Sequence, residues 1–280
     1  MKFFSGEEVV LPQGCGKLTM IRSKSGELMY LAEGSEKAVL MDTSIGVRGL
    51  RALVEELTDK PVTVLISHGH PDHAMGAPEF ETAYMNHRDI SPYRSMGDVK
   101  ERMDYAELSI GPQAREIPKE DYLPLEPDYA FEELSDGMSF DLGGMHIDVY
   151  AFPGHTRGCM VFLLREARIL ITGDACNNST FLFDENCSTV AEYRVQVEKI
   201  KDALEGKYDR VFVMHQVMEA APDLLAQMLL VCDDVLSGKS DELPFTFMGK
   251  QAMVAKNRNE KCERADGGYA NLVYNPERIR

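Results

Sequence analysis

One short segment holds the residues with the clearest chemical potential. Within 67–73 the chain reads Ser-His-Gly-His-Pro-Asp-His, which places His68, His70, Asp72 and His73 in the pattern His-x-His-x-Asp-His. Neutral imidazole and carboxylate groups are the ligands that borderline divalent metals such as zinc accept. A tight turn would let these side chains converge from alternate positions. The segment therefore predicts a metal site.

Three further candidate ligands lie later in the chain. His155, Asp174 and His215 each follow a run of residues that reads as a β-strand, and the segment 67–73 itself follows the buried strand expected at 62–66. Open α/β sheets place functional side chains at the carboxyl ends of their strands. Cys176 is close to Asp174 in sequence, but we interpret it as a small buried thiol rather than a ligand.

The elements that must position these residues form two successive halves of strands and helices. The first forty residues predict antiparallel strands, and Thr43 or Ser44 is expected to cap a helix whose apolar face includes 50–57. A hairpin is expected to turn at Gly143-Gly144, and helices are expected near 190–204 and 222–238. This order predicts an α/β fold of the αββα sandwich type in a single domain, 1–280, that ends in a short β-rich extension at about 239–280.

The segment at about 86–136 differs in composition from the rest of the chain. It holds thirteen acidic and six basic residues, and prolines and tyrosines are frequent in it. We interpret it as an inserted lid. The helical spacing of Val99, Met103, Ala106 and Ile110 predicts an amphipathic helix inside it. Packing of this helix explains the tyrosines of the insertion without any ligand.

Overall composition excludes several classes of function. The formal net charge of −16 disfavours nucleic acid as a partner, because a polyanion would be repelled. No apolar run approaches the roughly 20 residues that cross a bilayer, so we expect no membrane association. The N-terminus becomes acidic before an apolar signal core could form, and the six cysteines lack a C-x-x-C pair. These features favour a cytoplasmic protein with reduced thiols.

Together these motifs resemble the metallo-β-lactamase superfamily, over roughly Gly16 to His215. Its members share a duplicated αββα sandwich and a His-x-His-x-Asp-His motif that a distant His, Asp and His follow in this order. The resemblance implies one metal on His68, His70 and His155, and a second on Asp72, His73 and His215, with Asp174 bridging the two. Asp42, in Met41-Asp42-Thr43, matches a position that supports a metal-bound imidazole from behind.

A dinuclear centre of this kind predicts a hydrolase. Two divalent ions, zinc or alternatively manganese or iron, would lower the pKa of a shared water, so that a metal-bound hydroxide attacks the substrate. Asp72 and Asp174 are the expected catalytic carboxylates. We expect a small-molecule substrate with an ester, lactone, thioester or amide bond. The sequence leaves a homodimer open.

Other members of the superfamily fit the sequence less well. The best-known β-lactamases carry a cysteine where Asp174 stands, and glyoxalase-type thioesterases continue past His215 with a basic helical region. Phosphodiester hydrolysis is the next alternative, because two metals also stabilise an in-line displacement. Di-iron redox relatives usually carry a glutamate in place of His70 and a flavin domain, and mono-iron relatives lose part of the second site. A binding protein without activity would have no need of all seven ligands.

Overall fold

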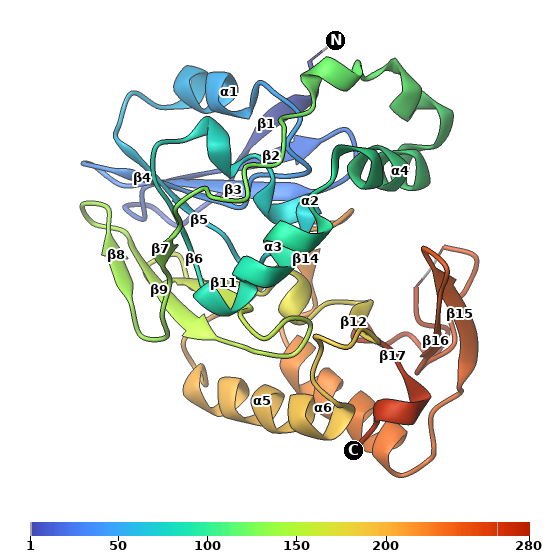
Figure 1. Cartoon of the computed structure of the whole chain (residues 1–280). Coiled ribbons are helices and arrows are strands. Elements are labelled where there is room, and N and C mark those ends of the chain that lie inside the picture. The colour runs from blue at the N-terminus through green and yellow to red at the C-terminus, as the bar shows by residue number, and fades with distance from the viewer. Residues whose placement is uncertain (1, 262) are drawn as a thin grey trace.

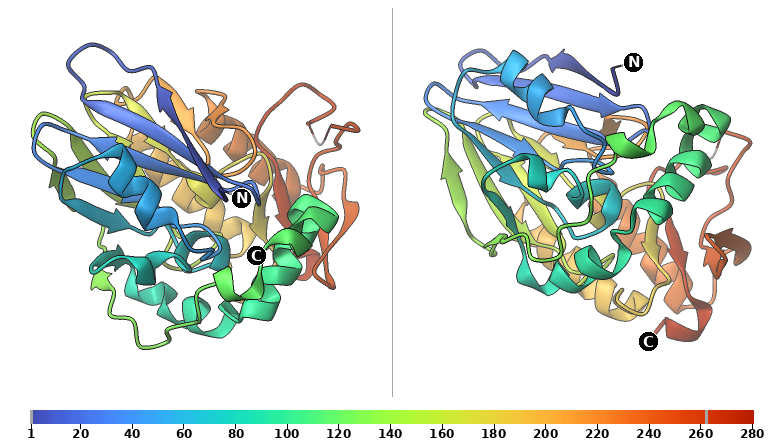
Figure 2. Two further views of the ribbon diagram at one scale, coloured as in Figure 1. Left: turned by 90° about the horizontal axis from the view of Figure 1, so that it is seen from above. Right: turned by 45° about the horizontal axis from the view of Figure 1, so that its top comes forward.

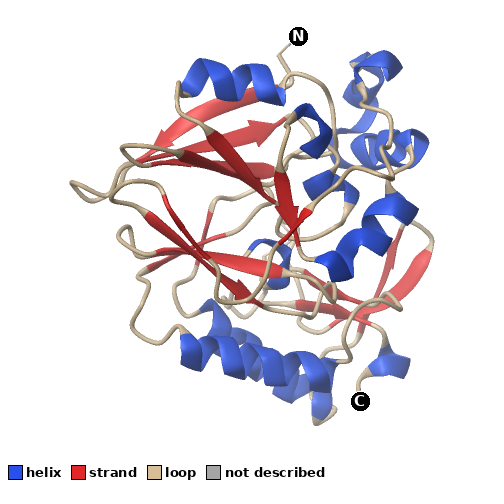
Figure 3. Ribbon diagram, turned by 60° about the vertical axis from the view of Figure 1, so that its left-hand side comes forward, coloured by secondary structure: helices blue, strands red, loops and turns tan. Residues whose placement is uncertain are grey.

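Two β-sheets lie face to face between outer layers of helices in the computed structural model, which describes residues 2–261 and 263–280 (Figures 1 and 3). The β-rich runs of the N-terminal half form a seven-stranded sheet, as the sequence predicts. In spatial order it contains β1 (Phe4–Val9), β2 (Lys17–Ser23), β3 (Leu28–Glu33), β4 (Ala38–Met41), β5 (Val62–Leu65), β6 (Ala83–Met85) and β7 (Glu132–Glu133). Strands β1 to β4 pair antiparallel and β4 to β7 pair parallel.

The second sheet has six strands and begins with the predicted hairpin. Gly143 and Gly144 both adopt φ 85°, a left-handed conformation that glycine adopts without steric strain. In spatial order the sheet contains β14 (Glu219–Ala220), β13 (Arg210–Phe212), β11 (Ile169–Ile171), β10 (Met160–Leu164), β9 (His146–Ala151) and β8 (Ser139–Asp141). Its neighbours pair antiparallel except β11 and β13, which are parallel.

Apolar side chains fill the space between the sheets and behind each of them. Residues such as Tyr30, Phe162 and Phe212 are buried in the central layer. Helices α5 (Val190–Ala203) and α6 (Leu224–Leu236) cover the outer face of the second sheet, and Thr189 and Glu192 form the predicted capping box of α5. The αββα sandwich expected from the sequence is therefore confirmed.

The first outer helix begins later than the sequence suggested. Helix α1 (Leu50–Leu57) has Gly49 as its N-cap, so the expectation that Thr43 or Ser44 caps it was wrong. The carboxylate of Glu79 instead accepts hydrogen bonds from the backbone N–H groups of residues 49, 50 and 51, at 2.9, 3.0 and 3.2 Å. Thr43 and Ser44 donate their hydroxyl hydrogens to other parts of the chain, at His73 O and Glu27 Oε2.

The predicted amphipathic helix of the insertion is present as α4 (Val99–Ile110), which follows α3 (Ile90–Met96). Ala106 is buried, and the other apolar residues of the predicted stripe pack against the core behind the first sheet. Arg102, also buried, donates to the carbonyls of Ile45 and Leu123, at 2.9 and 2.5 Å. The first bond fixes α4 to the loop that precedes α1, and the second fixes it to the chain that follows η4 (Lys119–Asp121).

The insertion is narrower than the expected range of 86–136. Glu132–Glu133 forms β7 and pairs with β6, so the chain has already returned to the first sheet there. The remaining helices are short and comprise α2 (Pro71–Ala74) and the 3-10 helices η1 (Ala77–Glu79), η2 (His87–Asp89), η3 (Gly111–Glu116), η4 (Lys119–Asp121), η5 (Gly173–Ala175) and η6 (Pro276–Arg278).

The C-terminal extension is β-rich, as predicted, and forms part of a third sheet. Its strands β15 (Leu243–Phe247), β16 (Lys250–Val254) and β17 (Leu272–Tyr274) continue to β12 (Thr180–Leu182), which pairs parallel with β17. The hairpin β15–β16 and helix α4 lie at the same end of the molecule (Figures 1 and 2). Within the described residues, no helix has both the length and the apolar character needed to span a membrane.

Candidate metal centre

The candidate ligands follow strands that end at one edge of the sandwich. Strands β4 and β5 are parallel, and β9, β11 and β13 point in a common direction because β9 and β11 are both antiparallel to β10. Each of these strands is followed by one part of the site: Asp42 after β4, His68, His70, Asp72 and His73 after β5, His155 after β9, Asp174 after β11 and His215 after β13. The fold thus collects residues that are far apart in sequence.

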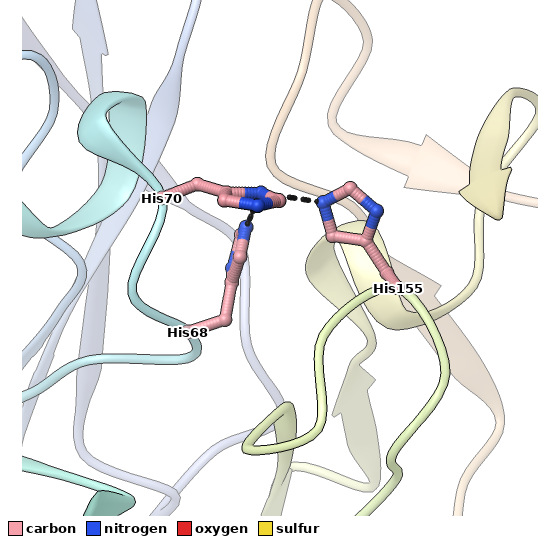
Figure 4. A group of neighbouring side chains, drawn as sticks. All are labelled: His68, His70 and His155. Atoms are coloured by element: carbon pink, nitrogen blue, oxygen red, sulfur yellow. Dashed lines mark hydrogen bonds between the residues drawn. The ribbon is translucent and has the colours of Figure 1, made fainter. Parts of the chain in front are cut away.

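Three imidazole rings converge in the first group of possible ligands (Figure 4). His70 Nδ1 lies 3.1 Å from His68 Nε2 and 2.8 Å from His155 Nε2. His68 and His155 are almost completely buried. The arrangement presents three nitrogen atoms to one point, which suits a metal ion that accepts imidazole ligands.

Two imidazoles and two carboxylates form the second group. His73 Nε2 lies 3.1 Å from His215 Nε2 and 3.5 Å from both Asp72 Oδ2 and Asp174 Oδ2. Asp174 Oδ2 also lies 3.9 Å from His155 Nε2, a member of the first group. Asp72 and His73 project from the short helix α2 rather than from an extended turn. The position of Asp174 between the groups is what a bridging ligand requires.

Hydrogen bonds on the far side of the rings fix how three of the histidines point. Asp42 Oδ2 lies 2.6 Å from His73 Nδ1 and accepts from Ser67 Oγ at 2.7 Å. Because Ser67 Oγ donates to Asp42, it is free to accept from His68 Nδ1, 3.1 Å away. His155 Nδ1 donates to the carbonyl of Phe181 at 2.8 Å. His68 and His155 therefore present an unprotonated Nε2 to the site. Burial opposes the charge of His73, but Asp72 and Asp42 raise the pKa of this ring well above its usual value, so its Nε2 becomes a ligand atom when a metal takes the place of the proton.

This donor set fits a divalent cation. Lone pairs of neighbouring imidazoles point at one another within 3.1 Å in the first group, and a cation between them would remove their repulsion. Burial lowers the pKa of His70 to about 3, so its ring is neutral and able to bind a metal. The same cause, burial, lowers the pKa of His68 well below its usual range.

The second group carries more charge. Burial opposes ionisation of Asp72 and Asp174, yet the nearby His73 and His215 lower the pKa of both carboxyl groups. Burial by itself would lower the pKa of His215, but the negative charges of Asp174 and, to a smaller extent, Asp72 raise it to about 9. Carboxylates and imidazoles thus stabilise each other's charged forms there, and a bound metal would take the place of the shared protons.

Asp89 organises both loops that carry the first group of candidate ligands, although its role was not predicted from the sequence. Its completely buried carboxylate accepts from Gly69 N at 2.9 Å, from Thr156 Oγ1 at 2.6 Å and from Gly158 N at 2.7 Å. These donors belong to the loops that carry His68, His70 and His155. The available signal was its position just after the buried strand β6. Inside the acidic segment 86–136 that signal did not stand out.

Tyr105 reaches the site from helix α4 of the insertion. Its hydroxyl donates to Asp72 Oδ2 at 3.1 Å. Burial, followed by the charge of Asp72, raises the pKa of this phenol well above its usual value, so it is a hydrogen-bond donor at neutral pH. Packing explains the other tyrosines of the insertion, as predicted from the sequence, but Tyr105 also contacts a candidate ligand.

The two remaining histidines belong to neither group of ligands, and Cys176 is the buried thiol that the sequence predicts. His87 Nδ1 lies 2.9 Å from Glu133 Oε2, and His146 Nδ1 lies 2.8 Å from Glu166 Oε1. Cys176 is fully buried among apolar residues beside α5 and α6. The cysteines at 15, 159, 176, 187 and 232 are free thiols, and Cys262 lies outside the described residues.

Comparison with known proteins identifies the class. The family model of the metallo-beta-lactamase superfamily matches residues 24–215. The chain belongs to this superfamily, and its fold and relatives make it a hydrolase. The solved structure of the metallo-beta-lactamase FIM-1 from Pseudomonas aeruginosa, in its mono-zinc form, has a TM-score of 0.55 and 18% identity, over 82% of this chain and 95% of the other.

Two curated relatives carry the names of thioesterases. The acyl-coenzyme A thioesterase MBLAC2 of Homo sapiens is 24% identical over 207 residues, which cover 67% of this chain and 72% of the relative. The atrochrysone carboxyl ACP thioesterase AgnL7 of Paecilomyces divaricatus is 27% identical over 169 residues, or 59% of this chain and 43% of the relative. The metal-ligand roles of the seven site residues remain predictions that rest on the geometry described above.

Replacing Asp42 by alanine is expected to lower metal affinity about 10- to 100-fold, the usual effect of losing a group that orients a ligand. His73 would lose its acceptor directly and His68 would lose it through Ser67. Titration of metal-free protein with zinc against a competing chelator measures the change. Asp59→Ala, at an exposed position, is the control and should bind zinc like the parent protein. Unchanged affinity in Asp42→Ala would contradict the orienting role.

Proposed function

We propose that the protein is a dinuclear, metal-dependent thioesterase. The observation that carries this proposal is the convergence of two ligand groups on a shared carboxylate, Asp174, which is 3.9 Å from His155 Nε2 and 3.3 Å from His215 Nε2. Zinc is the metal we propose, because three imidazoles in one group and two imidazoles with two carboxylates in the other are ligands that zinc accepts. The mono-zinc form of FIM-1 supports this choice.

Two bound divalent ions would supply a nucleophilic water of lowered pKa and would polarise the carbonyl of the substrate. The residues of the chain hold and orient these groups. Asp42, Ser67 and the carbonyl of Phe181 keep three imidazoles in the tautomer that binds metal. Asp72 is ionised beside His73 and His215 despite its burial, and its carboxylate is the group we propose to accept the proton.

The choice of a thioester among the carbonyl substrates rests on the relatives. MBLAC2 and AgnL7 are both named as thioesterases, and the chain matches MBLAC2 over 72% of that protein's length. The site itself offers the phenol of Tyr105, whose single O–H would have to turn from Asp72 Oδ2 to the substrate in order to stabilise a developing oxyanion. We propose a small-molecule substrate and a cytoplasmic location.

Metal removal tests the proposal. Chelation is expected to lower thioester hydrolysis at least about 100-fold, the effect of losing a single preorganised electrostatic group, and two equivalents of zinc per chain should restore it. A panel of thioester, lactone and phosphodiester substrates, assayed before and after chelation, identifies the bond. Full activity at one equivalent of metal would refute the dinuclear centre. Turnover of the phosphodiester alone would refute the thioesterase.

A further inference from the structure

The third sheet carries an aromatic surface on one side only. Cross-strand partners place Phe181 opposite Val273, Val273 opposite Val254, and Phe245 opposite Ala252, so these side chains share one face. Alternation along β15 adds Phe247 to the same face as Phe245. We call the rings of Phe181, Phe183, Phe245 and Phe247 the aromatic face.

These rings contact one another but are not covered. The ring centroids of Phe181 and Phe183 are 5.0 Å apart, those of Phe181 and Phe247 are 5.1 Å apart, and those of Phe181 and Phe245 are 5.9 Å apart. All four side chains remain partly exposed. Four neighbouring aromatic rings that are each partly exposed offer an apolar surface to a ligand.

The opposite side of the same sheet is an ordinary core. Leu182 and Tyr274, which point the other way from β12 and β17, are buried against α5 and α6. The aromatic face therefore points away from the helical layer. Phe181, Phe183 and Phe245 pack on the buried residues Ala252, Val254 and Val273 with one side, and their other side remains partly exposed.

One residue of the aromatic face contacts a candidate ligand through its backbone. The carbonyl of Phe181 accepts the hydrogen bond from His155 Nδ1, so the ring of Phe181 stands within one side-chain length of a ligand. Strand β12 follows η5, which carries Asp174. The ion pair between Lys250 and Asp184, at 2.5 Å, holds the β15–β16 hairpin against the end of β12. An acyl carbonyl at the metals would thus lie at the margin of this surface.

We propose that the aromatic face binds the apolar acyl group of the substrate, which makes medium-length acyl thioesters the preferred class. This inference rests on the proposed thioesterase function. Burial of methylene groups against aromatic rings is favourable in proportion to the area covered and places little demand on shape. Across the site, Leu108 is 59% exposed and lies one turn after Tyr105, on the same side of α4, so it can meet the same group.

Chain-length dependence of hydrolysis tests the inference. In the zinc-loaded protein, kcat/KM is expected to rise about twofold per methylene, half the gain of complete burial, and so roughly 50-fold from an acetyl to an octanoyl thioester. The double variant Phe245→Ala/Phe247→Ala should lose most of this gain and keep the rate on the acetyl substrate. Leu230→Ala, at a 67% exposed position on α6, is the matched control and should keep the gain. Equal rates on both substrates in the parent protein would overturn the inference.

A binding measurement separates this inference from the proposed reaction. The chain has no tryptophan, so Phe247→Trp provides a single fluorescent reporter on the aromatic face. Octanoate is expected to shift its emission to shorter wavelength in metal-free and zinc-loaded protein, whereas acetate should not. Leu230→Trp should respond to neither. If no thioester is hydrolysed while octanoate still binds, the proposed thioesterase activity is refuted and the aromatic face remains supported as an acyl-binding surface.

The alternative to an acyl group on the aromatic face is a second copy of the chain, which would bind there in a dimer. Light scattering of the parent protein and of the Phe245→Ala/Phe247→Ala variant measures this directly. A parent dimer that dissociates in the variant, with no octanoate response, would overturn the acyl site and assign the face to subunit contact. A mass that is the same in both proteins, together with the octanoate response, supports the acyl site.

Discussion

Replacing Asp174 by alanine is expected to leave one metal ion per chain and to lower kcat at least about 100-fold. Asp174 lies close to members of both groups of candidate ligands, since its Oδ2 is 3.3 Å from His215 Nε2 and 3.9 Å from His155 Nε2. Its loss leaves the three imidazoles of the first group intact. The second group keeps two imidazoles and one carboxylate, and loses the link to its partner.

Metal analysis and steady-state kinetics on the same preparation check this result. Asp174→Cys is an informative companion, because a thiolate can still bind one metal but offers a single ligand atom. It should bind more metal than Asp174→Ala and remain slower than the parent protein. If Asp174→Ala retained two metals and full activity, Asp174 would not be a bridging ligand, and the two groups would act independently.

Asp89→Ala is expected to destabilise the fold by about 3 kcal/mol or more, which corresponds to a fall in Tm of roughly 5 to 10 °C. The buried carboxylate accepts from Gly69, Thr156 and Gly158, and each donor would be left without its acceptor inside the protein. Leaving one buried donor unsatisfied costs about 1 to 3 kcal/mol. Because these donors lie in two ligand loops, metal affinity should fall together with stability.

Thermal unfolding of metal-free protein and zinc titration measure the two effects separately. The substitution Asp89→Asn is expected to lower the stability about as much as Asp89→Ala does. An amide has one acceptor oxygen, whereas the carboxylate uses both of its oxygens. The control is Asp104→Ala, on the exposed side of α4, where the ion pair with Lys100 contributes no more than about 1 kcal/mol. An Asp89→Ala variant as stable as the Asp104→Ala control would show that the loops hold their shape without the carboxylate.

Local pattern in the sequence was enough to select the candidate metal ligands and to predict the fold. Each candidate ligand follows a strand whose apolar residues identify it, and the family model matches residues 24–215, which include them all. Helix α4 and the capping box of α5 were also predicted, since helical periodicity and capping depend on residues three or four apart. The hairpin at Gly143-Gly144 was also predicted, because a tight turn depends on adjacent residues.

Only the tertiary structure decided which polar residues serve the site. Thr43 and Ser44 look like helix caps in the sequence, but α1 is capped by Glu79 from another segment. Asp89 and Tyr105 lie within an acidic stretch of the sequence. Their roles depend on distant partners, because Tyr105 contacts Asp72, 33 positions away, and Asp89 contacts Thr156, 67 positions away.

The aromatic face also depends on contacts between residues that are far apart in sequence. Phe181 and Phe245 are 64 positions apart, and they meet because β12 pairs with β17 at the far end of the chain. Periodicity identifies strands and helices because it reports neighbours along the chain. The pairing of distant strands depends on the free energy of the whole assembled core, which no local stretch of sequence contains. The sequence by itself therefore determined the class of chemistry, and the tertiary structure determined what surrounds it.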